Sequence, residues 1–158
     1  YLETMLSKED IQTIEKEAKQ FFEKLGMDGE VKVEGGDEST VSVEVTVAEP
    51  SMFIGEGGQT LFEIQHILKS IVRRKISEPL YLFLDINDYR KNKEDYLREL
   101  ARTTADEVAL LKKEKELPAM PAAERRIIHM ELAERGDVVS ESVGEGLERR
   151  VVVKVKSS

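Results

Sequence analysis

Apolar residues recur along this chain with two different periods, and the order of these periods predicts its secondary structure. From Ile11 to Leu25 they recur every three or four residues, which predicts an amphipathic helix that stops at Gly26. Ser7 and Asp10 precede this stripe at the spacing of a capping box, a motif that marks a helix start. The chain therefore opens with a helix that buries one face.

Two strands are predicted to follow this helix. Val31 and Val33 suggest a short strand, and Gly35-Gly36-Asp37 has the composition of a turn. A second strand with one buried face is predicted where four valines alternate with polar residues, namely Val41, Val43, Val45 and Val47. Pro50 ends this second strand.

A glycine-rich loop, a second long helix and a third strand complete the first half. The helix is expected from about Gly58 to Ile76, and the short segment Ser51–Ile54 favours a helical turn before the loop. Leu80–Leu84 is apolar at every position, which predicts a central strand that is buried on both faces. The expected order in this half is αββααβ.

The second half has a different order of elements. A long helix is expected from Asn87 or Asp88 to about Glu114, followed by an extended segment before Pro118. Pro121 suits the first turn of a further helix. Val138–Val143 and Arg149–Lys156 then predict a closing hairpin around a turn with two glycines. The sequence thus predicts two α+β domains, residues 1–86 and 87–158.

The loop Gly55-Glu56-Gly57-Gly58 is the first candidate site. Glycines at both ends let the backbone approach a ligand closely, and the helix that follows directs its positive end there. KH domains clamp about four nucleotides with such a Gly-x-x-Gly loop. The alternative is an ordinary turn between a strand and a helix. Glu56 lies where a phosphate-binding loop would prefer Lys or Arg.

The helix after this loop carries further candidates on one face. Gln59 follows the loop directly, and His66, Lys69 and Arg73 lie away from the apolar stripe. These residues form either a rim that follows a phosphate backbone or a solvated helix face. The spacing alone slightly favours the solvated face.

Charge and composition restrict the classes of function. The net charge is −8, and all of the excess lies in residues 1–86, which carry 9 basic and 17 acidic residues. Residues 87–158 carry 15 of each, so a basic footprint is expected in the second half. The chain has no Cys and no apolar run long enough to span a membrane, which fits a cytoplasmic protein.

Arg125 and His129 are the candidates in the second half. They lie one helical turn apart, so their side chains point the same way. In one interpretation Arg125 contacts a phosphate while His129 stacks on a base or forms a hydrogen bond with it. In the other, His129 supports a contact between helix and sheet, and Arg125 pairs with an acidic neighbour. Five further basic residues extend this candidate surface, namely Arg126, Arg149, Arg150, Lys154 and Lys156.

Nothing in the sequence favours an enzyme. Two His residues without any Cys argue against a zinc site, and no ordered triad, P-loop or carboxylate constellation occurs. We therefore expect no catalytic residue, no metal, no cofactor and no small-molecule substrate.

Taken together, the motifs resemble a known family. Residues 117–129 (Leu-Pro-Ala-Met-Pro-Ala-Ala-Glu-Arg-Arg-Ile-Ile-His) look like the start of an R-three-H domain, named for an Arg and a His separated by three residues. A KH domain followed by an R-three-H domain is similar to the bacterial Jag proteins, also called KhpB or SpoIIIJ-associated proteins. The resemblance covers nearly the whole chain and implies a type II KH fold in the first half. Glu56-Gly57 departs from the basic pair that family members generally have in the loop.

The resemblance also implies a function. It is the cytoplasmic binding of single-stranded RNA, with a regulatory role linked to cell shape or division and often with a small KH-domain protein as partner. We therefore expect non-catalytic binding of single-stranded RNA or DNA and no membrane association. The alternative is a protein-interaction module whose Gly-x-x-Gly loop has lost its affinity for nucleic acid.

Overall fold

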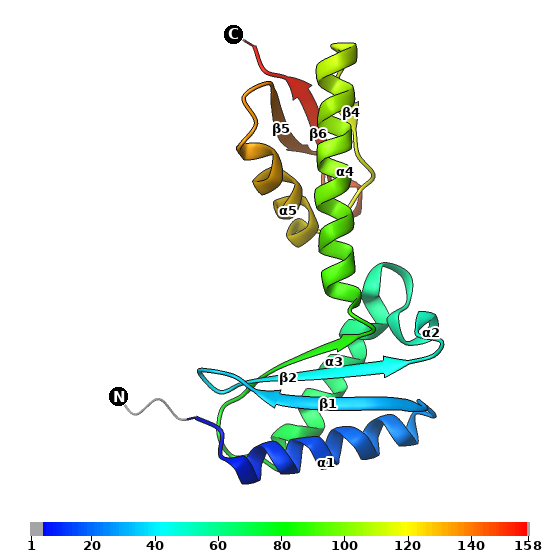
Figure 1. Cartoon of the computed structure of the whole chain (residues 1–158), viewed down its shortest axis with the longest axis vertical. Helices are drawn as coiled ribbons and strands as arrows, with labels where there is room; N and C mark the ends of the chain where they lie inside the picture. Colours follow the sequence, from blue (N-terminus) through cyan, green and yellow to red (C-terminus); the bar gives the residue numbers. More distant parts are fainter. Residues whose placement is uncertain (1–4, 158) are drawn as a thin grey trace. The chain divides into compact units, whose positions relative to one another are not determined.

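The computed structural model describes residues 5–157, which form two compact units. Residues up to Arg90 belong to the first unit and residues from Lys91 to the second. The elements of the first unit are α1 (Lys8–Lys24), β1 (Gly29–Gly35), β2 (Thr40–Val47), α2 (Ser51–Ile54), the 3-10 turn η1 (Glu56–Gly58), α3 (Gln59–Arg73) and β3 (Tyr81–Ile86) (Figure 1). The predicted αββααβ order is confirmed.

Helix α1 begins where the capping box predicts. The backbone N–H of Asp10 donates to Ser7 Oγ at 3.0 Å, and the N–H of Ser7 donates to the Asp10 carboxylate at 3.0 Å. Both bonds satisfy donors that a helix start leaves without partners. The buried face of the helix carries Ile14, Ala18 and Phe22, so the helix is fixed on the core by the stripe that its sequence predicts.

The sheet of the first unit has the order β1-β2-β3. Strand β1 is antiparallel to β2, and β3 is parallel to β2. All four valines of β2 point to one face and are buried, as their alternation predicts. Helices α1 and α3 cover this face (Figure 1), and α3 contributes Leu61, Ile64, Leu68 and Val72 to the shared core.

The prediction of a central strand at Leu80–Leu84 was wrong, because β3 is an edge strand. Leu82 and Leu84 are buried, but Tyr81 and Phe83 are 60% and 52% exposed on the face without helices. In place of another strand, two side chains form hydrogen bonds with the backbone at the open edge of β3. The N–H of Leu84 donates to Gln65 Oε1 at 2.9 Å, and Arg90 Nε donates to the Leu84 carbonyl at 3.0 Å.

The long helix starts later than predicted, at Tyr89. Asn87 and Asp88 have φ angles of 50° and 55°, which are not helical. The side-chain amide of Asn87 instead pairs with the backbone of Val47. It accepts from the Val47 N–H at 2.9 Å and donates to the Val47 carbonyl at 2.8 Å. Asn87 therefore extends the β2–β3 pairing by two side-chain hydrogen bonds before the helix begins.

The second unit packs two helices on a small sheet. Its elements are α4 (Tyr89–Leu111, which begins just before the unit), β4 (Lys115–Glu116), α5 (Ala122–Ala133), β5 (Val138–Val143), the 3-10 turn η2 (Gly146–Glu148) and β6 (Arg150–Val155). The antiparallel strand order is β4-β6-β5. The pairing of β5 with β6 confirms the predicted hairpin. The extended segment before Pro118 forms β4, the third strand of the sheet.

Both helices of this unit contribute to one core. Ala101 and Val108 of α4 and Ile128 of α5 are at most 1% exposed and pack with Val151 and Val153 of β6. Pro121 caps α5 in an extended conformation, one residue before the helix, and no side chain caps that end. Among residues 5–157, no helix is both long and apolar enough to cross a membrane.

Candidate nucleic-acid interface

The Gly55–Gly58 loop is a turn whose first position requires glycine. Gly55 has φ 74° and ψ 178°, a combination that residues with a Cβ almost never adopt. A Cβ there would lie 2.2 Å from Thr60 Oγ1. Gly57 and Gly58 also have positive φ angles, and the Gly58 N–H donates to the Gly55 carbonyl at 3.3 Å. The loop therefore has a fixed backbone with the exposed Glu56 on it.

The predicted rim on α3 lies on the surface of the first unit. His66 and Arg73 are exposed and Lys69 is partly buried. The spacing of Phe62, which is 63% exposed, puts it on the same side of the helix. The side chains of His66, Lys69 and Arg73 form no hydrogen bond or ion pair with residues 5–157. This face therefore combines positive charge with one exposed aromatic ring.

In the second unit, His129 joins α5 to the sheet. Its Nδ1 lies 2.7 Å from Ser140 Oγ, and its Nε2 lies 2.7 Å from Ser142 Oγ. The two serines lie two residues apart on β5, so both hydroxyls face the same side. Because both ring nitrogens are engaged, a base can form a hydrogen bond with His129 only if one of these contacts breaks. Stacking of a base on the face of the imidazole ring would leave both serine contacts in place.

Arg125 has no partner within the part of the chain that the structure describes. Its Nε is buried and forms no hydrogen bond. Leaving such a donor unsatisfied costs about 1–3 kcal/mol, and more when the group is charged. Arg125 and His129 thus each fit a different one of the two interpretations, structural support and nucleic-acid contact. His129 supports the contact between helix and sheet, while Arg125 has no acidic partner and is available to an anion.

The surroundings of His129 are positive. Partial burial lowers the pKa of His129 below its ordinary value of 6.5, and the nearby charges of Arg125 and Arg149 lower this pKa further. The imidazole is therefore neutral at neutral pH, and the positive charge at this site comes from the two arginines.

This lowered pKa predicts a stability effect. Below about pH 6.5 the unfolded chain binds a proton at His129 more readily than the folded chain, so stability falls as the pH falls. The free energy of unfolding of the wild type should therefore decrease relative to that of His129→Gln, which does not titrate. Urea unfolding of both proteins between about pH 8 and pH 5.5 measures this difference. A difference that is constant with pH would contradict the lowered pKa.

The other predicted cations differ in how available they are. Arg126 is exposed, and its side chain has no partner among residues 5–157. Arg149 Nη1 donates to the Gly144 carbonyl at 2.8 Å, which leaves its charge without a counterion. Arg150, in contrast, forms an ion pair with Glu116 at 2.8 Å. The available charge at this site is therefore on Arg125, Arg126 and Arg149.

Sequence reasoning did not include Ser140 and Ser142. Their spacing shows that they share one face of the predicted strand, but nothing in the sequence connects that face to His129. The contact depends on how α5 packs on β5, which brings residues 11 and 13 positions apart into hydrogen-bonding distance.

Comparison with known proteins gives one domain family and several relatives. Residues 95–155 match the R-three-H domain. The chain is 31% identical over 138 residues to a protein of Clostridium symbiosum named RNA-binding protein KhpB, an alignment that covers 87% of this chain and 62% of that protein. Proteins with the same name in Bacillus subtilis and Lactiplantibacillus plantarum are each also 31% identical, over 74% and 84% of this chain.

The chain spans less than two thirds of each of these relatives. It covers 57% of the Bacillus subtilis protein and 41% of the Lactiplantibacillus plantarum protein. The match to the R-three-H domain includes Arg125, His129 and both serines that hold the ring. The chain therefore carries an R-three-H domain and is a relative of the KhpB proteins along most of its length.

Proposed function

We propose that this protein binds single-stranded RNA without catalysing a reaction, and that Arg125 provides its principal phosphate contact. The observation that carries this proposal is the buried Nε of Arg125, which has no partner within residues 5–157. The guanidinium has no carboxylate partner there, and a phosphate supplies the negative charge that it lacks. The names of the relatives support RNA as the ligand.

The distribution of charge favours phosphate binding at Arg125, although residues 87–158 have no net charge. Most arginines of the second unit are paired with carboxylates. Arg98 and Arg102 both contact Glu131, and Arg135 contacts Asp106 and Asp137. Arg125, Arg126 and Arg149 have no such carboxylate partner among residues 5–157. The cations without a carboxylate partner therefore lie at the start of α5 and at Arg149, directly before β6.

The first unit adds a weaker contact in this proposal. Its Gly55–Gly58 loop and its rim of His66, Lys69 and Arg73 follow the backbone of the same kind of ligand, as in a KH domain. Glu56 opposes this contact by repelling phosphate. The names of the relatives favour RNA binding over a module that binds only proteins. A cytoplasmic location and a small KH-domain partner belong to the same proposal.

Fluorescence titration of the chain with a labelled single-stranded RNA tests the function. Binding should weaken as salt is added, because phosphate contacts release counterions with a slope of about −0.7 per contact on logarithmic axes. The same titration with single-stranded DNA measures the preference between the two. No binding to either strand at low salt would disprove the proposed function.

The loop of the first unit gives a separate prediction. Glu56→Lys replaces repulsion by attraction, so single-stranded RNA binding should tighten roughly tenfold at low salt. Glu38→Lys makes the same change of charge in the turn before β2, at the opposite end of that strand from the loop. The same titration compares the two variants. Equal effects would show that the gain is general attraction and not a contact of the loop.

A further inference from the structure

A small apolar cavity lies in the second unit beside the residues of the proposed phosphate site. It has a volume of about 230 Å³ and is lined by Ala119, Met120, Pro121, Gly146 and Leu147. The first three residues lead into α5, and the last two belong to the turn η2. A water molecule occupies about 30 Å³ in the liquid, so the cavity has room for a flat ring.

Leu147 is held at the edge of this cavity with almost no protein contact. The residue is 99% exposed, although backbone hydrogen bonds hold the turn that carries it. The N–H of Glu148 donates to the Glu145 carbonyl at 3.1 Å, and that of Arg149 donates to the Gly146 carbonyl at 3.3 Å. Gly144 and Gly146 have positive φ angles that allow the tight turn. The turn therefore presents an apolar side chain that the protein itself does not use.

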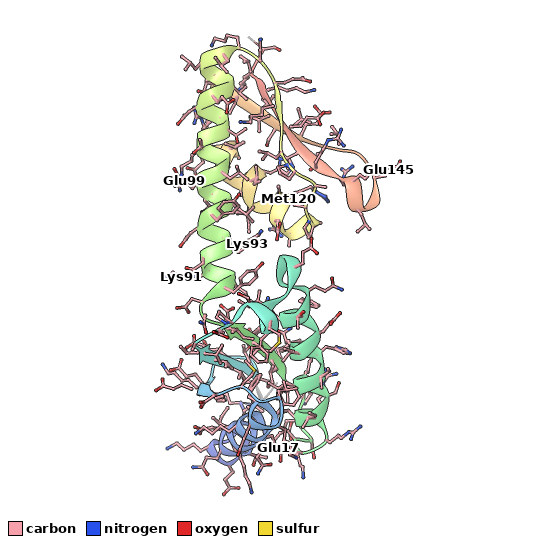
Figure 2. All side chains as sticks on the ribbon, turned by 90° about the vertical axis from the view of Figure 1, so that its right-hand side faces the viewer. Glu17, Lys91, Lys93, Glu99, Met120 and Glu145 are labelled. Atoms are coloured by element: carbon pink, nitrogen blue, oxygen red, sulfur yellow. The ribbon has the colours of Figure 1, made fainter. Side chains whose placement is uncertain are left out.

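Backbone hydrogen bonds connect the cavity to the cations. The N–H of Met120 donates to the Arg149 carbonyl at 3.2 Å, and the N–H of Arg125 donates to the Pro121 carbonyl at 3.0 Å. Two lining residues are thus bonded through their backbones to the two arginines whose charges act on His129. Figure 2 shows Met120 on the segment before α5 and Glu145 at the outer end of the turn.

The charges around Leu147 indicate which part of a nucleotide meets it. Glu145 and Glu148 are exposed on the same turn and repel phosphate. A nucleobase is uncharged, and its flat face packs against apolar side chains. A strand whose phosphate lies at Arg125 and Arg149 therefore directs a base, and not its backbone, toward Leu147.

We propose that this cavity, completed by Leu147, binds one base of the single-stranded RNA whose phosphate is held by Arg125 and Arg149. This inference rests on the proposed function and adds a base contact to it. Apolar contact without base-edge hydrogen bonds accepts any base, so the subsite adds affinity with little sequence preference.

The test uses the full chain and two oligonucleotides of equal length, one of uridine ribonucleotides and one with the same sugar-phosphate backbone but no bases. Leu147→Ala should weaken binding of the oligouridine roughly three- to tenfold and leave its salt dependence unchanged. Binding of the strand without bases should not change. Leu147→Trp offers a larger ring for stacking and should tighten binding of the oligouridine alone.

Leu110→Ala is the matched control, since Leu110 is 81% exposed on α4 and lies outside the cavity. It should bind both strands as the wild type does. Equal affinity of Leu147→Ala and the wild type for the oligouridine would overturn the base subsite and leave the proposed function standing. So would an equal loss of affinity for both strands. If the wild type binds neither strand, the proposed function fails as well.

Discussion

Arg125→Ala is expected to weaken the binding of single-stranded RNA about tenfold or more at low salt. The variant removes a guanidinium whose Nε is buried and without a partner among residues 5–157, so binding loses one phosphate contact. The slope of the logarithm of affinity against the logarithm of salt concentration should become shallower by about 0.7. Because a phosphate carries no sequence information, the loss should be similar for RNAs of different sequence.

Arg126→Ala serves as the matched control for this variant. It removes the same charge from the next residue of α5, but Arg126 is exposed, whereas Arg125 is partly buried and its Nε is closed to solvent. We expect a clearly smaller loss of affinity than for Arg125→Ala. Titrations of both variants over a range of salt concentrations make the comparison. Equal losses would show that only general charge matters, and Arg125 would no longer be a specific contact.

Gly55→Ala should destabilise the first unit by about 3 kcal/mol. Its φ of 74° and ψ of 178° are nearly restricted to glycine, and the added Cβ would meet Thr60 Oγ1 at 2.2 Å. The backbone N of Thr60 lies 3.0 Å from the same Cβ, so a side-chain rotation of Thr60 alone does not relieve the contact. Urea unfolding followed by the amide NMR signals of β1, β2 and β3 measures this loss in the first unit.

Gly57→Ala is the comparison for this prediction. Gly57 also has a positive φ, of 62°, but a Cβ there meets no atom within 4 Å. The expected loss of stability is therefore only about 1 kcal/mol, the ordinary cost of a left-handed alanine. If the two variants lose the same stability, close packing on Thr60 is not what requires glycine at the start of the loop.

The sequence alone determined the elements that depend on neighbouring residues. The spacing of Ser7 and Asp10 placed the start of α1, and the alternating valines of β2 identified its buried face. The hairpin of the second unit and the αββααβ order were also correct. The R-three-H motif was recognised from one segment of the chain, and the family match confirms it. The assignment of the first unit as a KH domain stays a prediction.

Tertiary structure decided what depends on residues that are distant in the sequence. The apolar run around Leu82 does not reveal whether another strand or a helix covers each face, so the exposure of Tyr81 and Phe83 could not be predicted. In the same way, His129 is held by two serines of another element, and Leu147 lies at the edge of a cavity that Met120 also lines. A local pattern fixes which side of an element is apolar, because period and burial are linked. Which element packs there depends on the fold of the whole unit.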